Sequence, residues 1–269
     1  MGAEDKDGFP QEAEGFTPGA GGVPAGANGL PAGADGLCQG FPEPPEDASL
    51  DDSVLAGLGS GLRGVFITFE GLDGCGKSTQ MELLAEGLRE RGYVVLVTRE
   101  PGGTPLGEAI RDILLNPRYK GMAARAEALL YAAARAHLVK EVIRPALEDG
   151  QVVLCDRYLD SSLAYQGYGR GLGVEDIITL NVWATECLFP DLTLFLDLDD
   201  AVRASRVASV PDRLEAEDDD FHRRVAEGYR KLLLDHPHRI RRVDASGSEA
   251  EVQARVRAVV EEELGLFSH

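Results

Sequence analysis

The sequence predicts an α/β fold in which a parallel sheet of about five strands carries helices on both faces. Short apolar segments alternate with longer helical segments from residue 64 onward, and this alternation is typical of parallel sheets. The apolar segments are continuous, which indicates strands that are buried on both faces. Because ligands bind beyond the carboxyl ends of parallel strands, we expect functional residues directly after them.

The individual elements can be placed from these patterns. Four strands are predicted over residues 65–69, 93–97, 152–155 and 192–196, and a more polar fifth segment, 239–243, is expected at an edge of the sheet. Helices are predicted over 77–91, roughly 105–115, 122–148, 174–187, 219–235 and 248–264. Glycine occupies every second position from 167 to 173, after no predicted strand, and we interpret this stretch as a flexible loop.

Composition excludes several classes of protein. A chain of 269 residues with 43% hydrophobic positions can bury a core without disulfides or a structural metal. Its four cysteines lie far apart with no CxxC pair, which argues against a disulfide scaffold and a zinc site. No apolar segment approaches the ~20 residues of a membrane span, and the acidic start lacks the features of a signal peptide. The net charge of −19 disfavours nucleic acid as a partner, so we expect a soluble, cytoplasmic protein.

The first 60 residues differ in composition from the rest of the chain. They hold 13 of the 32 glycines, 7 of the 14 prolines, and 11 acidic residues against one basic residue, Lys6. Such a segment buries too little apolar surface to offset its chain entropy. We therefore expect residues 1–60 to form a disordered acidic extension and residues 61–269 to form the folded domain. The alternative is a small repeat module or docking motif anchored by Phe9, Phe16 and Phe41.

A glycine-rich motif follows the first predicted strand. Residues 71–78 match the pattern GxxxxGK[ST] and connect that strand to a helix. In this motif backbone N–H groups wrap phosphate oxygens, Lys77 reaches the outer phosphates and the Ser78 hydroxyl suits Mg²⁺. The sequence thus predicts a nucleoside triphosphate site; the alternative is a turn that binds nothing. The residues expected to hold the phosphates are Gly71, Leu72, Asp73, Gly74, Cys75, Gly76, Lys77, Ser78 and Thr79.

Charged residues follow the second and third predicted strands. Arg99 and Arg157 are expected at the ligand edge of the sheet, where the planar guanidinium suits a second, phosphorylated substrate. Asp156 closes an apolar strand, a position from which a carboxylate can hold the water shell of a metal ion. The alternative is that these arginines form structural ion pairs with neighbouring carboxylates. The chain contains no Asn-Lys-x-Asp tetrad, which disfavours a switch GTPase.

The chain from about Gly64 to Leu264 resembles the thymidylate kinases, which are nucleoside monophosphate kinases. The matching strings are Phe69–Thr79, Arg99–Thr104, Leu129–Arg135, Asp156–Gln166, Pro190–Leu194 and Asp212–Glu215. The resemblance implies a three-layer P-loop kinase fold with a short lid. It also implies a homodimer that transfers the γ-phosphoryl group of ATP to dTMP with Mg²⁺, in dTTP biosynthesis.

The resemblance also assigns roles to single residues. The resemblance implies that Tyr131 stacks on thymine and that Arg135 hydrogen-bonds the base. Their i, i+4 spacing, which puts both on one helical face, is compatible with such a joint contact. Ser162 and Gln166 would lie near the base and phosphate, and Tyr165 near the sugar. The other acceptor residues are Asp73 at the 3′-hydroxyl, Arg99 and Arg157 at the monophosphate, and Glu215 in the lid.

The same resemblance implies catalysis by Lys77, Asp73 and Arg157, with Ser78 and Asp156 around the metal. A mobile arginine is also expected, and its local candidates are Arg203, Arg206 and Arg213, of which we choose Arg206. Two alternatives stay open: a kinase for another nucleotide or nucleoside, and a nucleotide-binding regulator without turnover.

Overall fold

The computed structural model describes residues 64–199, 202 and 212–267. The extension expected over residues 1–60 lies outside this part of the chain, as do Arg203, Arg206 and most of the expected lid. In the described residues, no helix is long and apolar enough to cross a membrane.

Five parallel strands form one sheet in the order β2-β3-β1-β4-β5. Their bounds are β1 Val65–Glu70, β2 Val95–Arg99, β3 Val152–Asp156, β4 Leu192–Asp197 and β5 Ile240–Asp244. The central strand is β1, and its register sets Phe69 opposite Asp156 of β3 and Leu194 of β4. The predicted α/β fold is confirmed, including the edge position of β5, and β2 begins two residues later than predicted.

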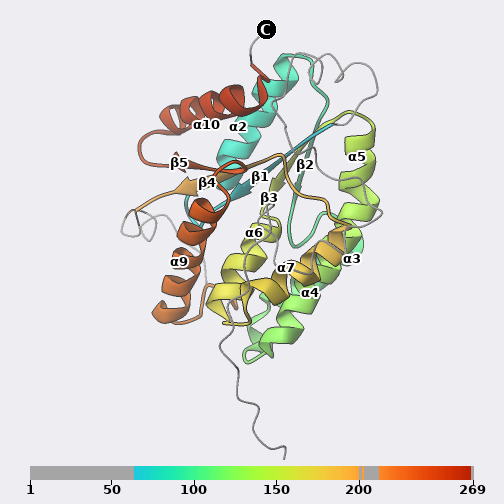
Figure 1. Ribbon diagram of the computed structural model, residues 1–269, viewed down its shortest axis with the longest axis vertical. Coiled ribbons are helices and arrows are strands. Elements are labelled where there is room, and N and C mark those ends of the chain that lie inside the picture. The colour runs from blue at the N-terminus through green and yellow to red at the C-terminus, as the bar shows by residue number, and fades with distance from the viewer. Residues whose placement is uncertain (1–63, 200–201, 203–211, 268–269) are drawn as a thin grey trace, which may run out of the picture.

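Helices cover both faces of the sheet, which gives three layers (Figure 1). One face carries α2 (Lys77–Glu90) and α10 (Glu249–Leu264). The helices on the other side are α3 (Pro105–Leu115), α4 (Ala124–Leu138), α5 (Arg144–Glu148), α6 (Leu159–Ser162), α7 (Val174–Thr185) and α9 (Asp219–Asp235). A short turn, η1 (Pro117–Tyr119), follows α3, and a π-helical segment, η2 (Val139–Ile143), joins α4 to α5, so the helix predicted over 122–148 consists of three parts.

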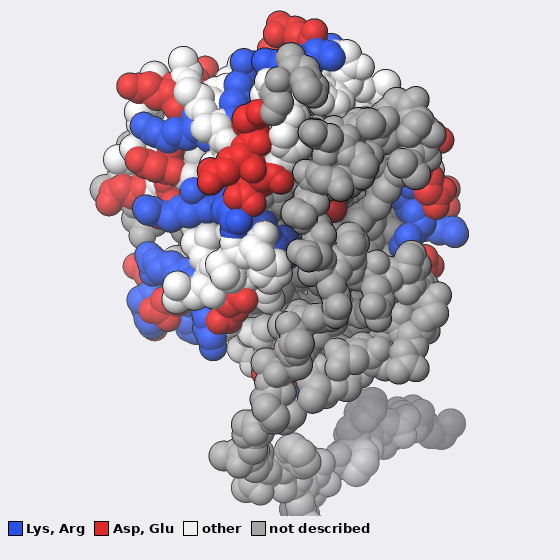
Figure 2. All heavy atoms as spheres, turned by 45° about the horizontal axis from the view of Figure 1, so that its top comes forward, with Lys and Arg blue, Asp and Glu red and all other residues white. Residues whose placement is uncertain are grey.

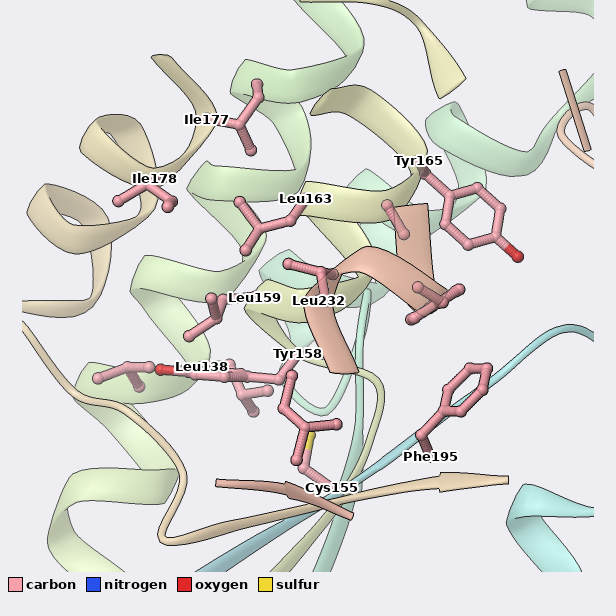
Figure 3. Packing of buried hydrophobic residues seen from close by; sticks show 14 of the residues in the cluster. Leu138, Cys155, Tyr158, Leu159, Leu163, Tyr165, Ile177, Ile178, Phe195 and Leu232 are labelled. Atoms are coloured by element: carbon pink, nitrogen blue, oxygen red, sulfur yellow. The ribbon is translucent and has the colours of Figure 1, made fainter. Parts of the chain in front are cut away.

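The core is divided by the sheet because side chains alternate along each strand. Phe66 of β1 faces the cluster under α4–α9, whereas Ile67 and Phe69 face the cluster under α2 and α10. Figure 3 shows the first cluster, with Cys155 and Phe195 on the sheet and, above them, Tyr158, Leu159, Leu163, Ile177 and Leu232. Burial of these continuous apolar strands on both faces is the main driving force for the fold.

Of the described cysteines, Cys75 and Cys155 are buried free thiols.

The prediction of a flexible loop at residues 167–173 was wrong for its first half. Leu163–Gly169 form the π-helical segment η3, which continues α6 and packs closely on α9. A Cβ at Gly169 would lie 2.8 Å from both Phe221 and Val225 of α9, and a Cβ at Gly228 would lie 2.6 Å from the Tyr168 ring. These glycines therefore permit the close approach of two helical segments.

Charges of both signs are mixed on the described part of the face in Figure 2, where Lys and Arg lie among Asp and Glu. This distribution differs from the basic stripe that is typical of nucleic-acid-binding surfaces.

Candidate active site

The loop between β1 and α2 has the backbone of a phosphate cradle. Gly76, the residue before α2, has φ 93°, and Gly71 has φ 136°, both in the region that favours glycine. A Cβ at Gly71 would lie 2.6 Å from the carbonyl oxygen of Leu196, so the loop fits against β4 only without a side chain there. The loop thus leads directly into a helix N-terminus, where free N–H groups and the helix dipole favour an anion.

Lys77 is held over this loop. Its Nζ donates to the carbonyl oxygens of Gly71 and Leu72 at 3.1 and 3.2 Å and lies 3.6 Å from Asp73 Oδ1. The side chain is buried, with 7% of its surface exposed. The ammonium group is therefore positioned by the loop itself, and a bound phosphate could replace the carbonyl oxygens as its acceptor.

Ser78 and Asp156 meet at the start of α2 and the end of β3. Ser78 Oγ donates to Asp156 Oδ2 at 2.9 Å. A hydroxyl and a carboxylate are hard oxygen ligands of the kind that Mg²⁺ prefers, usually beside waters and phosphate oxygens. In the described residues no group of three or more His, Cys, Asp or Glu side chains could hold a metal ion. One hydroxyl and one carboxylate leave the other coordination positions to waters and phosphate oxygens, so the pair fits an ion that is shared with a phosphate.

Arg157 connects the loop with a neighbouring cavity. Its φ of 70° is unusual for a residue other than glycine, and its N–H donates to the Phe69 carbonyl oxygen at 2.9 Å. The guanidinium donates to Asp73 Oδ1 at 2.6 Å and to Ser161 Oγ at 3.2 Å, and it lies over the Tyr165 ring, 5.3 Å from the centroid. Backbone strain of this kind is common where a side chain must be aimed at a ligand.

The Asp73 carboxylate stays ionised in this setting. Burial would raise its pKa, but the positive charges of Arg157 and Lys77 outweigh burial and lower the pKa below its usual value. The loop therefore carries one fixed negative charge between two fixed positive charges.

Sequence reasoning missed Glu70, the last residue of β1. It is fully buried and accepts hydrogen bonds from Ser161 Oγ at 2.6 Å and Tyr229 Oη at 2.7 Å, and both hydroxyls also contact Arg157. Burial, with the nearby charge of Asp160, raises the pKa of Glu70. The available signal was an acidic residue at the end of an otherwise apolar strand.

A cavity opens beside Arg157 and contains seven of the nine residues expected to bind an acceptor. They are Asp73, Tyr131, Arg135, Arg157, Ser162, Tyr165 and Gln166. Arg99 and Glu215 do not line it. The remaining lining residues are Glu100, Pro101, Arg111, Leu115, Ser161, Asp212 and Leu214.

The two absent residues have other partners. Arg99 Nη2 donates to both carboxylate oxygens of Glu108, at 3.1 and 3.0 Å, and the Arg99 side chain is 55% exposed. Glu215 accepts a hydrogen bond from the Asp212 N–H at 2.9 Å, within its own turn. The guanidinium in the cavity that sequence reasoning missed is Arg111 of α3, whose Nη1 donates to the Pro101 carbonyl oxygen at 2.9 Å. No sequence signal separated Arg111 from other helix-surface arginines.

Arg135 of α4 is buried, with 1% of its surface exposed. Its Nε donates to Glu100 Oε2 at 2.6 Å, and its other nitrogens donate to Ser162 Oγ at 2.9 Å, to the Tyr158 carbonyl oxygen at 3.0 Å and to Asn181 Oδ1. Four of its five N–H groups thus bind protein atoms, which leaves one for a ligand.

Glu100 is the acidic partner of this arginine. Burial raises its pKa to about 7, against the opposing effect of Arg135. Its second oxygen, Oε1, is buried without a hydrogen-bond partner among the described residues. Glu100 was not among the expected site residues, although it follows Arg99 directly at the end of β2.

Arg213 is excluded as the mobile arginine by its contacts. It is buried, and it donates to the Leu114 carbonyl oxygen at 2.6 Å and to Glu127 Oε2 at 2.7 Å. The other two candidates, Arg203 and Arg206, lie outside the described residues.

A second cavity lies on the other side of the phosphate loop. Leu72 and Cys75 of the loop line it together with the carboxyl ends of β4 and β5 and with Ala226 and Arg230 of α9. The loop is therefore flanked by two cavities at the edge of the sheet where ligands bind in parallel α/β folds.

The chain is similar to known proteins over this whole region. A family model described as thymidylate kinase matches residues 69–256. A thymidylate kinase of Pelotomaculum thermopropionicum is 51% identical over 209 residues, which cover 77% of this chain and 97% of the relative. One of Clavibacter sepedonicus is 54% identical over 200 residues, which cover 73% and 94% of the two chains.

The fold is similar as well. A crystal structure of thymidylate kinase from Ehrlichia chaffeensis superposes with a TM-score of 0.62 at 35% sequence identity, covering 74% of this chain and 99% of that one. The matched residues include the phosphate loop, Arg157 and the residues that line the first cavity. The chain belongs to the thymidylate kinase family.

Proposed function

We propose that the protein is an enzyme that transfers the γ-phosphoryl group of ATP to the phosphate of dTMP, forming dTDP and ADP in dTTP biosynthesis. The observation that carries this function is the Asp73–Arg157 ion pair, which joins the phosphate loop to the acceptor cavity. Two anion-binding surfaces therefore lie side by side, as direct transfer between two bound phosphates requires. Family membership supports dTMP as the acceptor.

On the donor side, the loop N–H groups and Lys77 would bind the triphosphate. Ser78 and Asp156 would hold Mg²⁺, which when bound neutralises negative charge on the phosphates. The second cavity begins at Leu72 and Cys75, and it would take the nucleoside of ATP. The volume that a Cβ at Gly71 would fill is already occupied by β4, so this position of the cradle requires glycine.

On the acceptor side, Arg157 and Arg111 would hold the monophosphate, and Tyr131 and Arg135 would bind the base. The attacking oxygen is already anionic, so no strong general base is needed, and the residues act by alignment and charge neutralisation. Asp73 keeps Arg157 directed toward the transfer position. Arg206 remains our choice for the mobile arginine.

The assembly and the location of the enzyme are also proposals. Large apolar side chains are exposed on three neighbouring helices: Leu106 and Ile113 of α3, Leu129 of α4 and Trp183 of α7. We propose that this surface, the α3–α4–α7 face, forms the interface of a homodimer, because monomers rarely expose such groups together. We also propose that residues 61–269 are the catalytic unit and that the enzyme works in the cytoplasm.

A coupled assay of ADP formation tests the proposed function. The purified full chain would be given ATP and Mg²⁺ with dTMP, dUMP, UMP, CMP or thymidine in turn. We expect turnover with the highest kcat/KM for dTMP. Preference for another acceptor would indicate a different nucleotide or nucleoside kinase, and ATP binding without any turnover would indicate a regulator.

A further inference from the structure

Glu127 of α4 is the centre of a buried cluster of charges. It is fully buried, with no exposed surface. Its Oε2 accepts hydrogen bonds from Arg170 Nη2 at 2.9 Å and from Arg213 Nη1 at 2.7 Å. Its Oε1 accepts from Arg170 Nε at 3.1 Å and from Gln166 Nε2 at 2.9 Å. Both oxygens of this carboxylate are therefore fully used.

The contact with Gln166 matters because this amide lines the acceptor cavity. An amide has a donating end, the NH₂ group, and an accepting end, the carbonyl oxygen. An ionised carboxylate can only accept hydrogen bonds, so Glu127 requires the donating end of Gln166 to face it. The accepting end, Gln166 Oε1, is then directed toward the cavity. Among the described residues, this oxygen receives no hydrogen bond.

Glu127 stays ionised in this cluster. Burial would raise its pKa, but hydrogen bonds and charge from Arg170, together with Gln166 and Arg213, outweigh burial and lower the pKa. The orientation of the Gln166 amide therefore does not vary over the neutral pH range.

We propose that Glu127 is a specificity-determining positioning residue, which fixes the Gln166 amide so that a hydrogen-bond acceptor faces the base of the acceptor nucleotide. The proposal rests on the proposed function, because it takes a pyrimidine monophosphate as the occupant of the cavity. A pyrimidine whose ring nitrogen N3 carries a hydrogen, as in thymine and uracil, matches Gln166 Oε1. Cytosine presents a lone pair at N3, so two acceptors would face each other and remain unpaired in a buried site.

Replacement of Glu127 by Gln should reverse the orientation of Gln166. The new side chain has a single oxygen, and two charged donors, Arg170 Nη2 and Arg213 Nη1, converge on the position of Oε2. That oxygen is expected to stay with the arginines, because hydrogen bonds to charged groups are the stronger ones. The new NH₂ group then faces Gln166 and the Arg170 Nε–H, which loses its acceptor. Gln166 must turn its own oxygen inward and present NH₂ to the cavity.

The experiment compares kcat/KM for dTMP, dUMP and dCMP in the wild type and in Glu127→Gln. We expect the dTMP-to-dCMP ratio to fall about tenfold or more, since sites that pair with a substrate N–H discriminate strongly against analogues lacking it. The dTMP-to-dUMP ratio should not change, because both bases carry N3–H. A uniform loss for all three acceptors would mean a merely structural role and would overturn the proposal.

Glu217→Gln is the matched control. Glu217 also binds Arg170, at 2.7 Å, and the change removes the same charge without touching Gln166. We expect its dTMP-to-dCMP ratio to equal that of the wild type. A similar fall in this control would show that the charge around Arg170, and not the amide of Gln166, sets the selectivity.

Gln166→Met keeps the proposal testable if Glu127→Gln does not fold. This change removes the amide and leaves the ion pairs of Glu127 with Arg170 and Arg213 in place. Its dTMP-to-dCMP ratio should fall as well, and an unchanged ratio would overturn the proposal. Where both variants fold, adding Glu127→Gln to Gln166→Met should have no further effect on the ratio. If the wild type itself does not act on dTMP, the proposed function fails first.

Discussion

Asp73 and Arg157 lie 84 positions apart in the chain and form an ion pair of 2.6 Å. Asp73 belongs to the phosphate loop, and Arg157 follows β3, the strand next to β1. Neighbouring parallel strands end at the same edge of the sheet, so residues that follow them meet there. The contact therefore results from strand order, and it fixes the position of the acceptor cavity relative to the donor loop.

Lys77→Ala is expected to lower kcat by about 100-fold or more, because removing one group that stabilises transition-state charge typically costs that much. The Tm should change little, since among the described residues Nζ contacts only groups of its own loop, namely the carbonyl oxygens of Gly71 and Leu72, the Asp73 carboxylate and the Cys75 sulfur. The coupled ADP assay and a thermal melt check both. Lys77→Met, which retains most of the apolar stem, should be as inactive as Lys77→Ala. Near-normal turnover in either variant would contradict the role of Lys77 as a phosphate ligand of the loop.

Arg111→Ala and Arg99→Ala should behave differently. Hydrogen bonds to a charged partner contribute ~1.5–3 kcal/mol, so loss of Arg111 should lower kcat/KM by about tenfold or more for every monophosphate acceptor. Arg99 does not line the acceptor cavity, and its mostly exposed side chain binds Glu108. We expect Arg99→Ala to change kcat/KM by less than about threefold. The reverse order would show that Arg99 turns to the phosphate when a substrate binds.

The fold was largely predictable from the sequence, whereas the directions of single side chains were not. Val65–Glu70 and Val152–Asp156 are apolar up to their acidic last residues, with Thr68 as the one exception, and such segments are typical of strands buried on both faces in the interior of a sheet. The glycines at 167 and 169 led to the wrong prediction of a flexible loop, because they were interpreted as a sign of backbone freedom. Gly169 is instead a contact point for Phe221 and Val225, residues more than 50 positions away.

Pairing over long distances also explains what the sequence did not show in the site. Arg99 ends β2 and Arg157 directly follows β3, but Glu108 binds the first and Asp73 binds the second. Arg213 was a candidate for a mobile group until its partner Glu127, 86 positions away, was known. A motif identifies which residue types are available, and only the packing of elements decides which ones face a ligand.

Arg135→Ala should destabilise the fold as well as the binding of the base. Its removal leaves Glu100 buried and unpaired, and breaking a buried ion pair from one side typically costs about 3–5 kcal/mol. Urea denaturation measures this loss. The double variant with Glu100→Gln should recover part of it, because the unpaired charge is then absent as well. Full stability of Arg135→Ala alone would contradict the pairing.

Trp183→Glu tests the homodimer. Trp183 is 73% exposed on the α3–α4–α7 face, and a charge there would be buried without a partner if the face forms an interface. Sedimentation velocity should show a dimer for the wild type and a monomer for the variant. Leu234 of α9, which is 80% exposed outside this face, supplies the control variant Leu234→Glu, and we expect it to remain dimeric. A dimeric Trp183→Glu, or a monomeric wild type, would reject this interface.

The pH dependence of stability should reveal the buried Glu100. Its pKa is raised from 4.5 to about 7 in the folded protein, mainly by burial. Between these two values the folded chain holds a proton that the unfolded chain has released. The contribution of Glu100 to stability is thus fully present below pH 4.5 and is lost as the pH rises through about 7. The Tm of the wild type relative to Glu100→Gln should therefore be higher at pH 5 than at pH 8.

Glu108→Gln provides a control of opposite sign. A hydrogen bond from the Gly103 N–H and the pairing with Arg99 lower the pKa of Glu108, so its contribution is present at neutral pH and is lost as the pH falls. The Tm of the wild type relative to Glu108→Gln should accordingly be higher at pH 8 than at an acidic pH. Glu100 directly follows β2 and Glu108 lies in the first turn of α3. General charge effects would move both comparisons in one direction. Opposite slopes would therefore locate the raised pKa at Glu100, and parallel slopes would contradict it.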